Sequence, residues 1–536
     1  MRFLAICFLL VSSYSLHAIT LDLYHTNDLH SYMEDSGDEP SLGGYPALKA
    51  SLDDNKKKSL DAGNETLLLD GGDFSEGNLY YWAEKGFRSF EAVYKLGYDA
   101  VVVGNHDWLM GSPELNAILK RLNPKKPFLS ANMSISVAYP YIGKHIRPYQ
   151  IFNKGGVKIG VIGLTTKEIL YQWQLVGGKI KNPIKAAKKY VKILRKQHDV
   201  DFVIMLTHLG SETDKEMIRK VEGIDLVVGG HSHEFFPKPI IEKNSKSGQL
   251  VPIVQLGAHG KWLGKMTLDL VPDKPLKIEE YEVLEVKNSV EDSAMLSYVE
   301  NAKKEYRAVL GETWLDEVVG YSEVPLEPAI TRPTIWGNVV TDAIKEVIDA
   351  DVSVHSGSFE GHEQPAGNIT RANIVTGYPR IFELKDPTGW KIYDVYIQGW
   401  LVGSVSWAVL KLGIPLYFGG LDFDLEDKGK GKLKVKNMRI DGKKINPLKF
   451  YRVALTEGVV RGGFGISSLV GLIFRSVWKS GYTVFEAIEK KIESLGGTIS
   501  KDYGLERGYA HGIMLVPIKG HKKRKRKFNV FKRSGR

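Results

Sequence analysis

Five short apolar runs in the first half of the chain each end in a cluster of polar residues. Such runs, bounded by glycine or polar residues, are typical of buried strands. Helical patterns alternate with them, and Ser112 and Asn182 each precede a proline, as an N-cap precedes the first helical residue. This alternation predicts a layered α/β domain over residues 19–286 and leaves open whether its sheet is single or paired. The runs are Leu21–Tyr24, Leu67–Leu69, Val101–Val103, Phe202–Leu206 and Leu226–Val228.

The second half of the chain has a different pattern. Residues 287–310 place apolar side chains at helical spacing, which predicts an amphipathic linker helix. Beyond it, abundant glycine and short strands such as Lys391–Ile397 and Tyr451–Leu455 predict a second domain over residues 311–518. Lysines alternate with glycine or apolar residues over Lys428–Lys444, which predicts an exposed hairpin whose edge is protected by charge.

Composition and charge add less than the pattern does. The 536 residues have the composition of a soluble globular protein and are enough for two or three domains. Residues 522–536 contain nine lysines and arginines and no carboxylate, so most of the net charge of +10 belongs to a tail. We expect this tail, residues 519–536, to be disordered. It either contacts an anionic surface or is merely solubilising.

The N-terminus has the layout of a secretory signal peptide. Arg2 precedes the apolar stretch Phe3–Val11, and small residues lead to Ala18, near which we expect cleavage. The only cysteine, Cys7, lies in this segment, so the mature chain is expected to have no disulfide. No later segment is apolar for long enough to span a bilayer. We therefore expect an extracytoplasmic protein, periplasmic or secreted, without a transmembrane segment after cleavage.

The polar clusters after the five runs contain oxygen and imidazole ligands for metal ions. Loops at strand ends of an open α/β sheet collect at one edge, so the clusters are expected to share a site. Two divalent cations a few ångströms apart can clamp a phosphoryl group and generate a hydroxide. Nitrogen and oxygen ligands without sulfur suit zinc, manganese, iron or magnesium. The predicted ligands are Asp28, His30, Asp73, Asn105, His208, His231 and His233.

Within this set, Asp73 is the expected bridge between the cations. It stands alone after Gly71 and Gly72, which allow close backbone approach. His25 and His259 lie near the clusters in sequence, but we assign neither of them to metal. A single histidine after a strand is more often a hydrogen-bonded structural residue. The indication of metal binding therefore comes from all five clusters occurring in this order.

In this order, the clusters resemble those of the calcineurin-like metallophosphoesterase superfamily. With the leading segment Leu23–His30, they are similar to the exported 5′-nucleotidase and UDP-sugar hydrolase family. The resemblance implies a four-layer α/β/β/α metal domain and a C-terminal α/β substrate domain joined by a helix. It also implies that His106 contacts the phosphate and stabilises charge at the leaving group, and Asn105 is a further candidate contact to the substrate. The implied ligands are Asp28, His30, Asp73 and His233 for one cation, and Asp73, Asn105, His208 and His231 for the other.

The chain departs from the family next to the catalytic histidine. The family motif continues Gly-Asn-His-Glu-Phe-Asp, and its last carboxylate orients that histidine, whereas Leu109 occupies this position here. Without that carboxylate, we expect slower hydrolysis or a different proton donor. Asp107 also carries a carboxylate, but as the immediate neighbour of His106 it is expected to point elsewhere.

The second half resembles the substrate domain of the same family, beginning with the helix motif Trp336–Ala343, but its nucleotide contacts are altered. Glu360 replaces an arginine, Gly458 replaces a stacking aromatic residue, and Phe464 replaces an aspartate. Phe418 keeps an aromatic residue at a family position, so it either stacks on a substrate ring or belongs to the core.

The main hypothesis is an exported phosphoester hydrolase that requires two divalent metal ions. Nucleotides are the default substrates, and a metal-bridging water or hydroxide is the expected nucleophile. One alternative is hydrolysis of a sulfur ester on the same scaffold. The other is a non-catalytic surface-binding protein that retains the metal site, which Leu109, Glu360 and Gly458 motivate.

Overall fold

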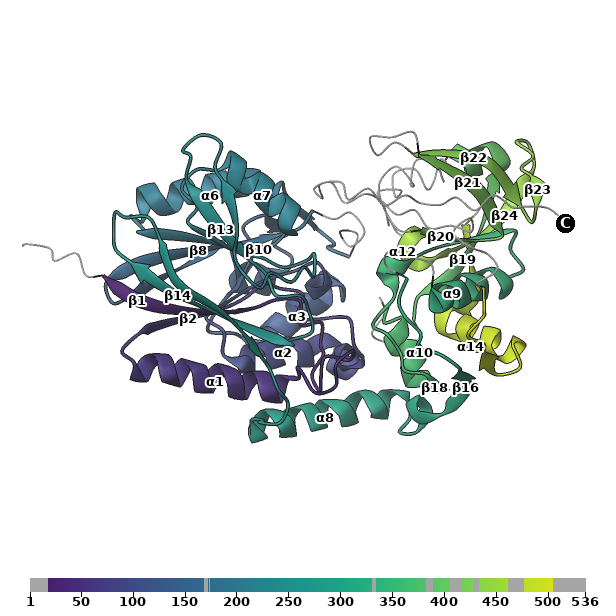
Figure 1. Cartoon of the computed structure of the whole chain (residues 1–536), viewed down its shortest axis with the longest axis horizontal. Coiled ribbons are helices and arrows are strands. Elements are labelled where there is room, and N and C mark those ends of the chain that lie inside the picture. The colour runs from purple at the N-terminus through teal and green to yellow at the C-terminus, as the bar shows by residue number, and fades with distance from the viewer. Residues whose placement is uncertain are drawn as a thin grey trace, which may run out of the picture.

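Two α/β units lie side by side, and helix α8 (Ser293–Leu310) joins them along one edge (Figure 1). The computed structural model describes residues 18–167, 172, 174–329, 334–381, 389–404, 416–427, 433–460 and 477–504. The predicted signal peptide, apart from Ala18, and the predicted basic tail lie outside these residues. Within the described ranges, no helix combines the length and apolar character needed to cross a bilayer.

The first unit contains two β-sheets that pack face to face. Leucine, isoleucine and valine side chains from both sheets, including Leu23, Leu69 and Ile204, form the core between them. The first sheet has the order β15 (Lys277–Glu285), β14 (Trp262–Leu270), β1 (Ile19–Thr26), β2 (Glu65–Asp70), β3 (Ala100–Val102), β4 (Phe128–Leu129) and β6 (Ile146–Arg147). The second has the order β12 (Ile240–Lys243), β13 (Leu250–Val254), β11 (Leu226–Val228), β10 (Phe202–His208), β8 (Val157–Thr165) and β7 (Tyr149–Lys154).

Helices cover the outer faces of both sheets and complete the predicted four layers (Figure 1). Helices α1 (Tyr45–Asp61), α2 (Phe87–Leu96) and α3 (Ser112–Leu122) pack on the first sheet. Helices α6 (Pro183–Gln197) and α7 (Ser211–Lys220) pack on the second. Strands β1, β2 and β3 are parallel, as are β8, β10 and β11, so the predicted ligand clusters leave both sheets from carboxyl ends of strands.

One of the two predicted helix caps is present. The Asn182 side chain accepts a hydrogen bond from Lys185 N at 2.9 Å and caps α6. The prediction that Ser112 caps α3 is wrong. The chain enters α3 through Gly111, whose φ of 88° suits glycine, and this places Ser112 inside the first turn. The hydroxyl of Ser112 has no hydrogen-bond partner among the described residues.

The second unit is built on a five-stranded sheet. The strands expected at Lys391–Ile397 and Tyr451–Leu455 are β19 (Lys391–Gln398) and β24 (Phe450–Thr456). The sheet order is β20 (Leu416–Gly419), β17 (Val352–Ser356), β24, β19 and β25 (Val477–Thr483). Three smaller elements flank it, namely helices α9 (Ile335–Glu346), α10 (Arg371–Gly377) and α14 (Val484–Ser494).

Two small sheets complete the second unit. One has the order β18 (Gly367–Thr370), β16 (Val318–Ser322) and β26 (Thr498–Ile499). The other has the order β21 (Leu421–Asp427), β22 (Leu433–Ile440) and β23 (Lys443–Lys444). The second of these includes the described part of the hairpin predicted at Lys428–Lys444.

Candidate metal centre

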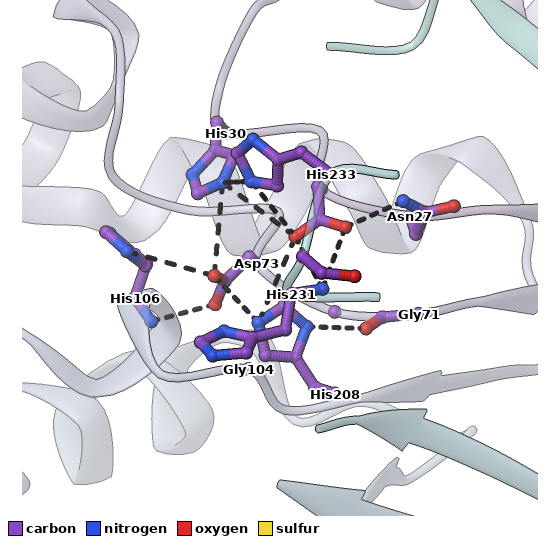
Figure 2. A network of polar contacts seen from close by, with 12 residues as sticks. Asn27, His30, Gly71, Asp73, Gly104, His106, His208, His231 and His233 are labelled. Carbon is purple, nitrogen blue, oxygen red and sulfur yellow. Dashed lines mark hydrogen bonds and ion pairs between the residues drawn. The ribbon is translucent and has the colours of Figure 1, made fainter. Parts of the chain in front are cut away.

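The polar clusters that follow β1, β2, β3, β10 and β11 meet at one end of the paired sheets, where their side chains face one another (Figure 2). The backbone there is unusual, because five predicted ligands adopt positive φ. Non-glycine residues in this conformation cost of order 1–3 kcal/mol each, and they concentrate at functional sites. The φ values are 53° for Asp28, 46° for His30, 53° for Asp73, 82° for His231 and 51° for His233.

One group of candidate ligands consists of Asp28, His30 and His233, whose ligand atoms all lie within 4.8 Å of one another. The Nε2 atom of His233 is 3.1 Å from His30 Nε2 and 3.4 Å from Asp28 Oδ1. Burial, together with neighbouring His106, lowers the pKa of His30 to about 3. His30 is therefore neutral at physiological pH, the form in which imidazole binds metal.

The orientation of His30 is fixed by its other ring nitrogen. Its Nδ1 lies 2.7 Å from the carbonyl oxygen of Glu76, to which it donates as the N–H tautomer. The lone pair of Nε2 then points toward His233 and Asp28. A backbone carbonyl behind the ring is the usual support of a metal-binding histidine.

The second group consists of Asp73, His208 and His231, with ligand atoms again within 4.8 Å of one another. His208 Nε2 is 2.8 Å from Asp73 Oδ2, and its Nδ1 is 2.8 Å from the carbonyl oxygen of Gly71. Asp73 also faces the first group, because its Oδ2 is 3.9 Å from His30 Nε2. Burial opposes ionisation of Asp73, but His208 and His106 hold the pKa of its carboxyl well below the ordinary value.

Asn105 lies in the loop after β3, directly before His106. Its side chain is buried, and its Oδ1 has no hydrogen-bond partner among the described residues. A buried amide oxygen without a partner is unfavourable unless a ligand satisfies it. The carboxylates and imidazoles of the two groups fit two divalent cations, and six of the seven predicted ligands belong to these groups.

The two histidines that were not assigned to metal lie outside both groups. His25, in β1, has its Nε2 3.2 Å from the hydroxyl of Tyr281, in β15 of the same sheet. His259 stacks on Tyr32, with 3.8 Å between ring centroids, and its Nδ1 lies 3.1 Å from the carbonyl oxygen of Ser36. Each is therefore held by contacts of its own.

His106 begins a short 3₁₀ helix, η2 (His106–Trp108), directly after the loop that carries Asn105. Its backbone N donates to Asp73 Oδ1 at 2.8 Å, and its ring Nε2 faces Asp73 Oδ2 at 3.9 Å (Figure 2). The ring Nδ1 contacts the carboxylate of Glu76. Sequence reasoning missed Glu76, because its loop position after β2 matches none of the ligand clusters.

The Glu76 carboxylate also contacts the second unit. Its Oε2 lies 3.0 Å from Arg380 Nη1, and its side chain is only 2% exposed. Burial opposes ionisation of Glu76, but Arg380 and His106 hold the pKa of its carboxyl below the ordinary value. An ionised carboxylate therefore lies between the candidate catalytic histidine and the second unit.

Asp107 points away from the ring of His106, as expected. Its Oδ2 accepts hydrogen bonds from Gly104 N at 2.7 Å and Asp73 N at 3.0 Å, and its Oδ1 accepts one from Ser75 N at 2.9 Å. Asp107 thus connects the loops after β2 and β3. Leu109 is buried in the apolar core and supplies no polar group to the site.

Glu360, which stands where the related family has an arginine, lies inside the second unit. Its carboxylate accepts a hydrogen bond from Ala329 N at 2.5 Å and lies 2.9 Å from His355 Nε2. The side chain is buried, so the carboxyl group faces the interior of the unit and is not presented to solvent.

The aromatic positions of the second unit also lie in its interior. A Cβ atom at Gly458 would collide with the Trp390 ring, so Trp390 fills the space that a larger side chain would need. Phe418 is buried, with its ring 5.8 Å from that of Phe423. Stacking of Phe418 on a substrate stays a prediction, and Phe464 lies outside the described residues.

A four-layer α/β/β/α unit with two aspartate–histidine groups at its strand ends defines a calcineurin-like metallophosphoesterase, a class of phosphoric ester hydrolases. Residues 21–235 match the family model for calcineurin-like phosphoesterase, and residues 318–471 match that for the 5′-nucleotidase C-terminal domain. The chain is 31% identical over 504 residues to a 5′-nucleotidase of Rattus norvegicus, covering 84% of each protein. The chain therefore belongs to the 5′-nucleotidase family.

A second relative agrees with this assignment, and a solved structure has the same fold. A 5′-nucleotidase of Diplobatis ommata is 30% identical over 346 residues, which are 60% of this chain and 58% of that protein. The fold is similar to that of a 5′-nucleotidase precursor from Thermus thermophilus, with a TM-score of 0.76 and 22% identity. That likeness covers 90% of this chain and 99% of the other. The predicted family, enzyme class and two-domain α/β fold are confirmed.

Proposed function

We propose that the protein is an extracytoplasmic hydrolase of 5′-nucleotides that acts with two divalent cations. The observation that carries this proposal is the convergence of two ligand groups around Asp73, each with its ligand atoms within 4.8 Å. Membership of the 5′-nucleotidase family and the relatives of that name support nucleotides as substrates. The signal-peptide pattern at the N-terminus supports export.

The seven candidate ligands would hold the cations, with Asp73 shared between the two groups. When bound, such a pair polarises phosphoryl oxygens and promotes ionisation of water at neutral pH. The chain's own part is to present His106 next to Asp73, where its Nε2 can reach a phosphate oxygen or the leaving oxygen. Oxygen and nitrogen ligands suit zinc, manganese, iron or magnesium.

The test is an assay of the purified mature protein with manganese or zinc. Substrates should include a 5′-nucleotide, a cyclic nucleotide, an aryl phosphate and a sulfur ester. We expect preferential release of phosphate from the 5′-nucleotide. We expect D73A to abolish turnover and to lower bound metal, whereas D53A, on the exposed side of α1, should change neither.

The other outcomes identify the alternatives. Faster turnover of the sulfur ester would contradict nucleotide hydrolysis and favour the sulfur-ester hydrolase. No turnover of any substrate, with two equivalents of metal bound, would contradict an enzymatic role and favour a binding protein.

A further inference from the structure

Glu76 supplies the carboxylate that contacts the ring of His106, a group that the sequence motif around His106 lacks. In this chain the motif residue that would supply a carboxylate is Leu109, which is buried among apolar side chains. The carboxylate of Asp107 already accepts hydrogen bonds from three backbone N–H groups. We propose that Glu76 is the positioning residue of His106, and that Arg380 of the second unit holds Glu76 in place. This inference rests on the proposed function of His106 in phosphoester hydrolysis.

The geometry of the His106 ring supports this role. Glu76 contacts Nδ1, so that nitrogen carries the proton shared with the carboxylate, and Nε2 on the opposite side of the ring faces the candidate metal centre. The ring also lies edge-on to His30, with 4.9 Å between centroids. An imidazole held from behind by a carboxylate keeps one tautomer and one orientation, which reduces the reorganisation needed during reaction.

Arg380 fixes the carboxylate from the side of the second unit. Its Nη1 lies 3.0 Å from Glu76 Oε2, while its Nε and Nη2 donate to the carbonyl oxygens of Phe359 and Ser358, each at 3.0 Å. The guanidinium is buried and anchored to its own unit by two backbone acceptors. Its position therefore follows that of the second unit, and the orientation of His106 depends on the two units being docked as they are here.

A second contact lies beside the first at the same interface. The Tyr32 hydroxyl is 2.8 Å from His362 Nδ1, which joins the loop after β1 to the second unit. Tyr32 in turn stacks on His259, whose backbone N donates to the Asp28 carbonyl oxygen at 2.8 Å. The interface thus reaches the loops of both ligand groups, but the Glu76 contact reaches the candidate catalytic histidine directly.

A purely structural ion pair between the units is the competing explanation, and kinetics separate the two. We expect E76A to lower kcat by about 10- to 100-fold while KM and bound metal change little. The loss should be larger for adenosine 5′-monophosphate than for 4-nitrophenyl phosphate, whose leaving group needs less stabilisation.

Two further variants refine the test. E76D should recover part of the rate. R380M should lower kcat by a smaller factor than E76A, because Glu76 remains on its own loop.

The matched control is D394N. Asp394 is also a buried carboxylate with an arginine partner, since its Oδ2 lies 2.8 Å from Arg452 Nη2 in the sheet of the second unit. Its substitution should leave kcat and the preference between the two substrates unchanged. Equal losses in E76A and D394N, or a loss in E76A that follows loss of metal, would overturn the proposal.

A spectroscopic measurement makes the test independent of turnover. In protein labelled with ¹⁵N-histidine, the proton on His106 Nδ1 should give a downfield resonance that H106N removes. We expect E76Q to shift it and E76A to broaden it, while D394N leaves it in place. An unchanged resonance in E76Q and E76A would overturn the proposal even if both variants are slow. If the wild-type protein hydrolyses no substrate, the proposed function fails, and this resonance still decides whether Glu76 positions His106.

Discussion

At the scale of single residues, Asp73 after β2 and Asp107 after β3 have different roles in the candidate centre. Asp73 faces both ligand groups, and its backbone N is held by the Asp107 carboxylate. Asp107 therefore determines the approach of the loops after β2 and β3 without contributing a ligand. Burial and the nearby charge of Asp73 raise the pKa of the Asp107 carboxyl well above its ordinary value.

Removal of this carboxylate should affect stability and metal binding together. D107A leaves three buried N–H groups without an acceptor, and each unsatisfied group costs about 1–3 kcal/mol. We expect a lower midpoint of urea unfolding and a lower metal content by elemental analysis. D99A is the matched control, because Asp99 accepts from one backbone N–H, that of Leu68, away from the candidate centre. D99A should keep the metal content, and a D107A protein with full metal occupancy would contradict the role of Asp107.

At the scale of elements, the N-termini of α6 and α3 differ in how they are capped. The side chain of Asn182 satisfies a backbone N–H of α6, whereas the hydroxyl of Ser112 inside α3 satisfies none. The same Ser/Asn-Pro sequence signal therefore has different energetic consequences. The difference comes from the glycine that precedes Ser112 and shifts the helix start.

Substitution of the two residues by alanine should reproduce this difference. We expect N182A to lower the free energy of unfolding by about 1 kcal/mol, because it removes the acceptor of Lys185 N. S112A should not lower it, because no cap is lost. Urea unfolding of both variants measures the two effects side by side. An equal loss in both would show that Ser112 does cap α3 in solution.

A buried carboxyl in the first turn of α7 should make stability depend on pH. Burial raises the pKa of Asp214 to about 7 from its ordinary 3.8. The folded state then binds the proton more tightly than the unfolded state, so this contribution is fully present below pH 3.8 and is lost as pH rises through about 7. We expect D214N to be more stable than wild type at pH 8 by at most about 4 kcal/mol, roughly three pKa units. The difference should vanish at pH 3.5. If the free energies of unfolding of D214N and wild type, measured with urea, differed by the same amount at every pH, this expectation would be contradicted.

At the scale of the whole molecule, the candidate centre lies where the two units meet. Helix α8 joins them along one edge (Figure 1). Near the ligand loops, Glu76–Arg380 and Tyr32–His362 connect them. Apolar side chains of both units belong to one continuous core cluster. Changes at the centre are therefore expected to influence how the units dock.

Removal of metal should expose this coupling. Without cations, the buried carboxylates Asp28 and Asp73 lose the charges that compensate them, and their loops keep their backbone strain. We expect a chelator to lower the temperature of the first calorimetric transition and to broaden the Nδ1 resonance of His106, and the diamagnetic ion zinc to reverse both effects. The D73A protein serves as the control and should respond little to chelator. A melting profile unchanged by chelator would contradict metal binding at this site.

The hydrophobic pattern and the order of polar clusters determined the main elements and the candidate ligands. Strands β1, β2, β3, β10 and β11 lie at the predicted runs to within a few residues, since local burial and turn chemistry set strand ends. The second unit was predicted less completely, because its strands are short and its family motifs are altered.

Only the tertiary structure decided how these pieces pair. A sequence pattern records which face of a strand is buried but not what covers it, so the two-sheet sandwich emerged from packing between β1, β2 and β10 side chains. The contacts of Glu76 were likewise not recorded in the sequence pattern. It lies 30 residues from His106 and 304 from Arg380, and no local periodicity links positions so far apart. The chain itself specified which residues can bind metal, and folding decided which carboxylate holds the histidine beside them.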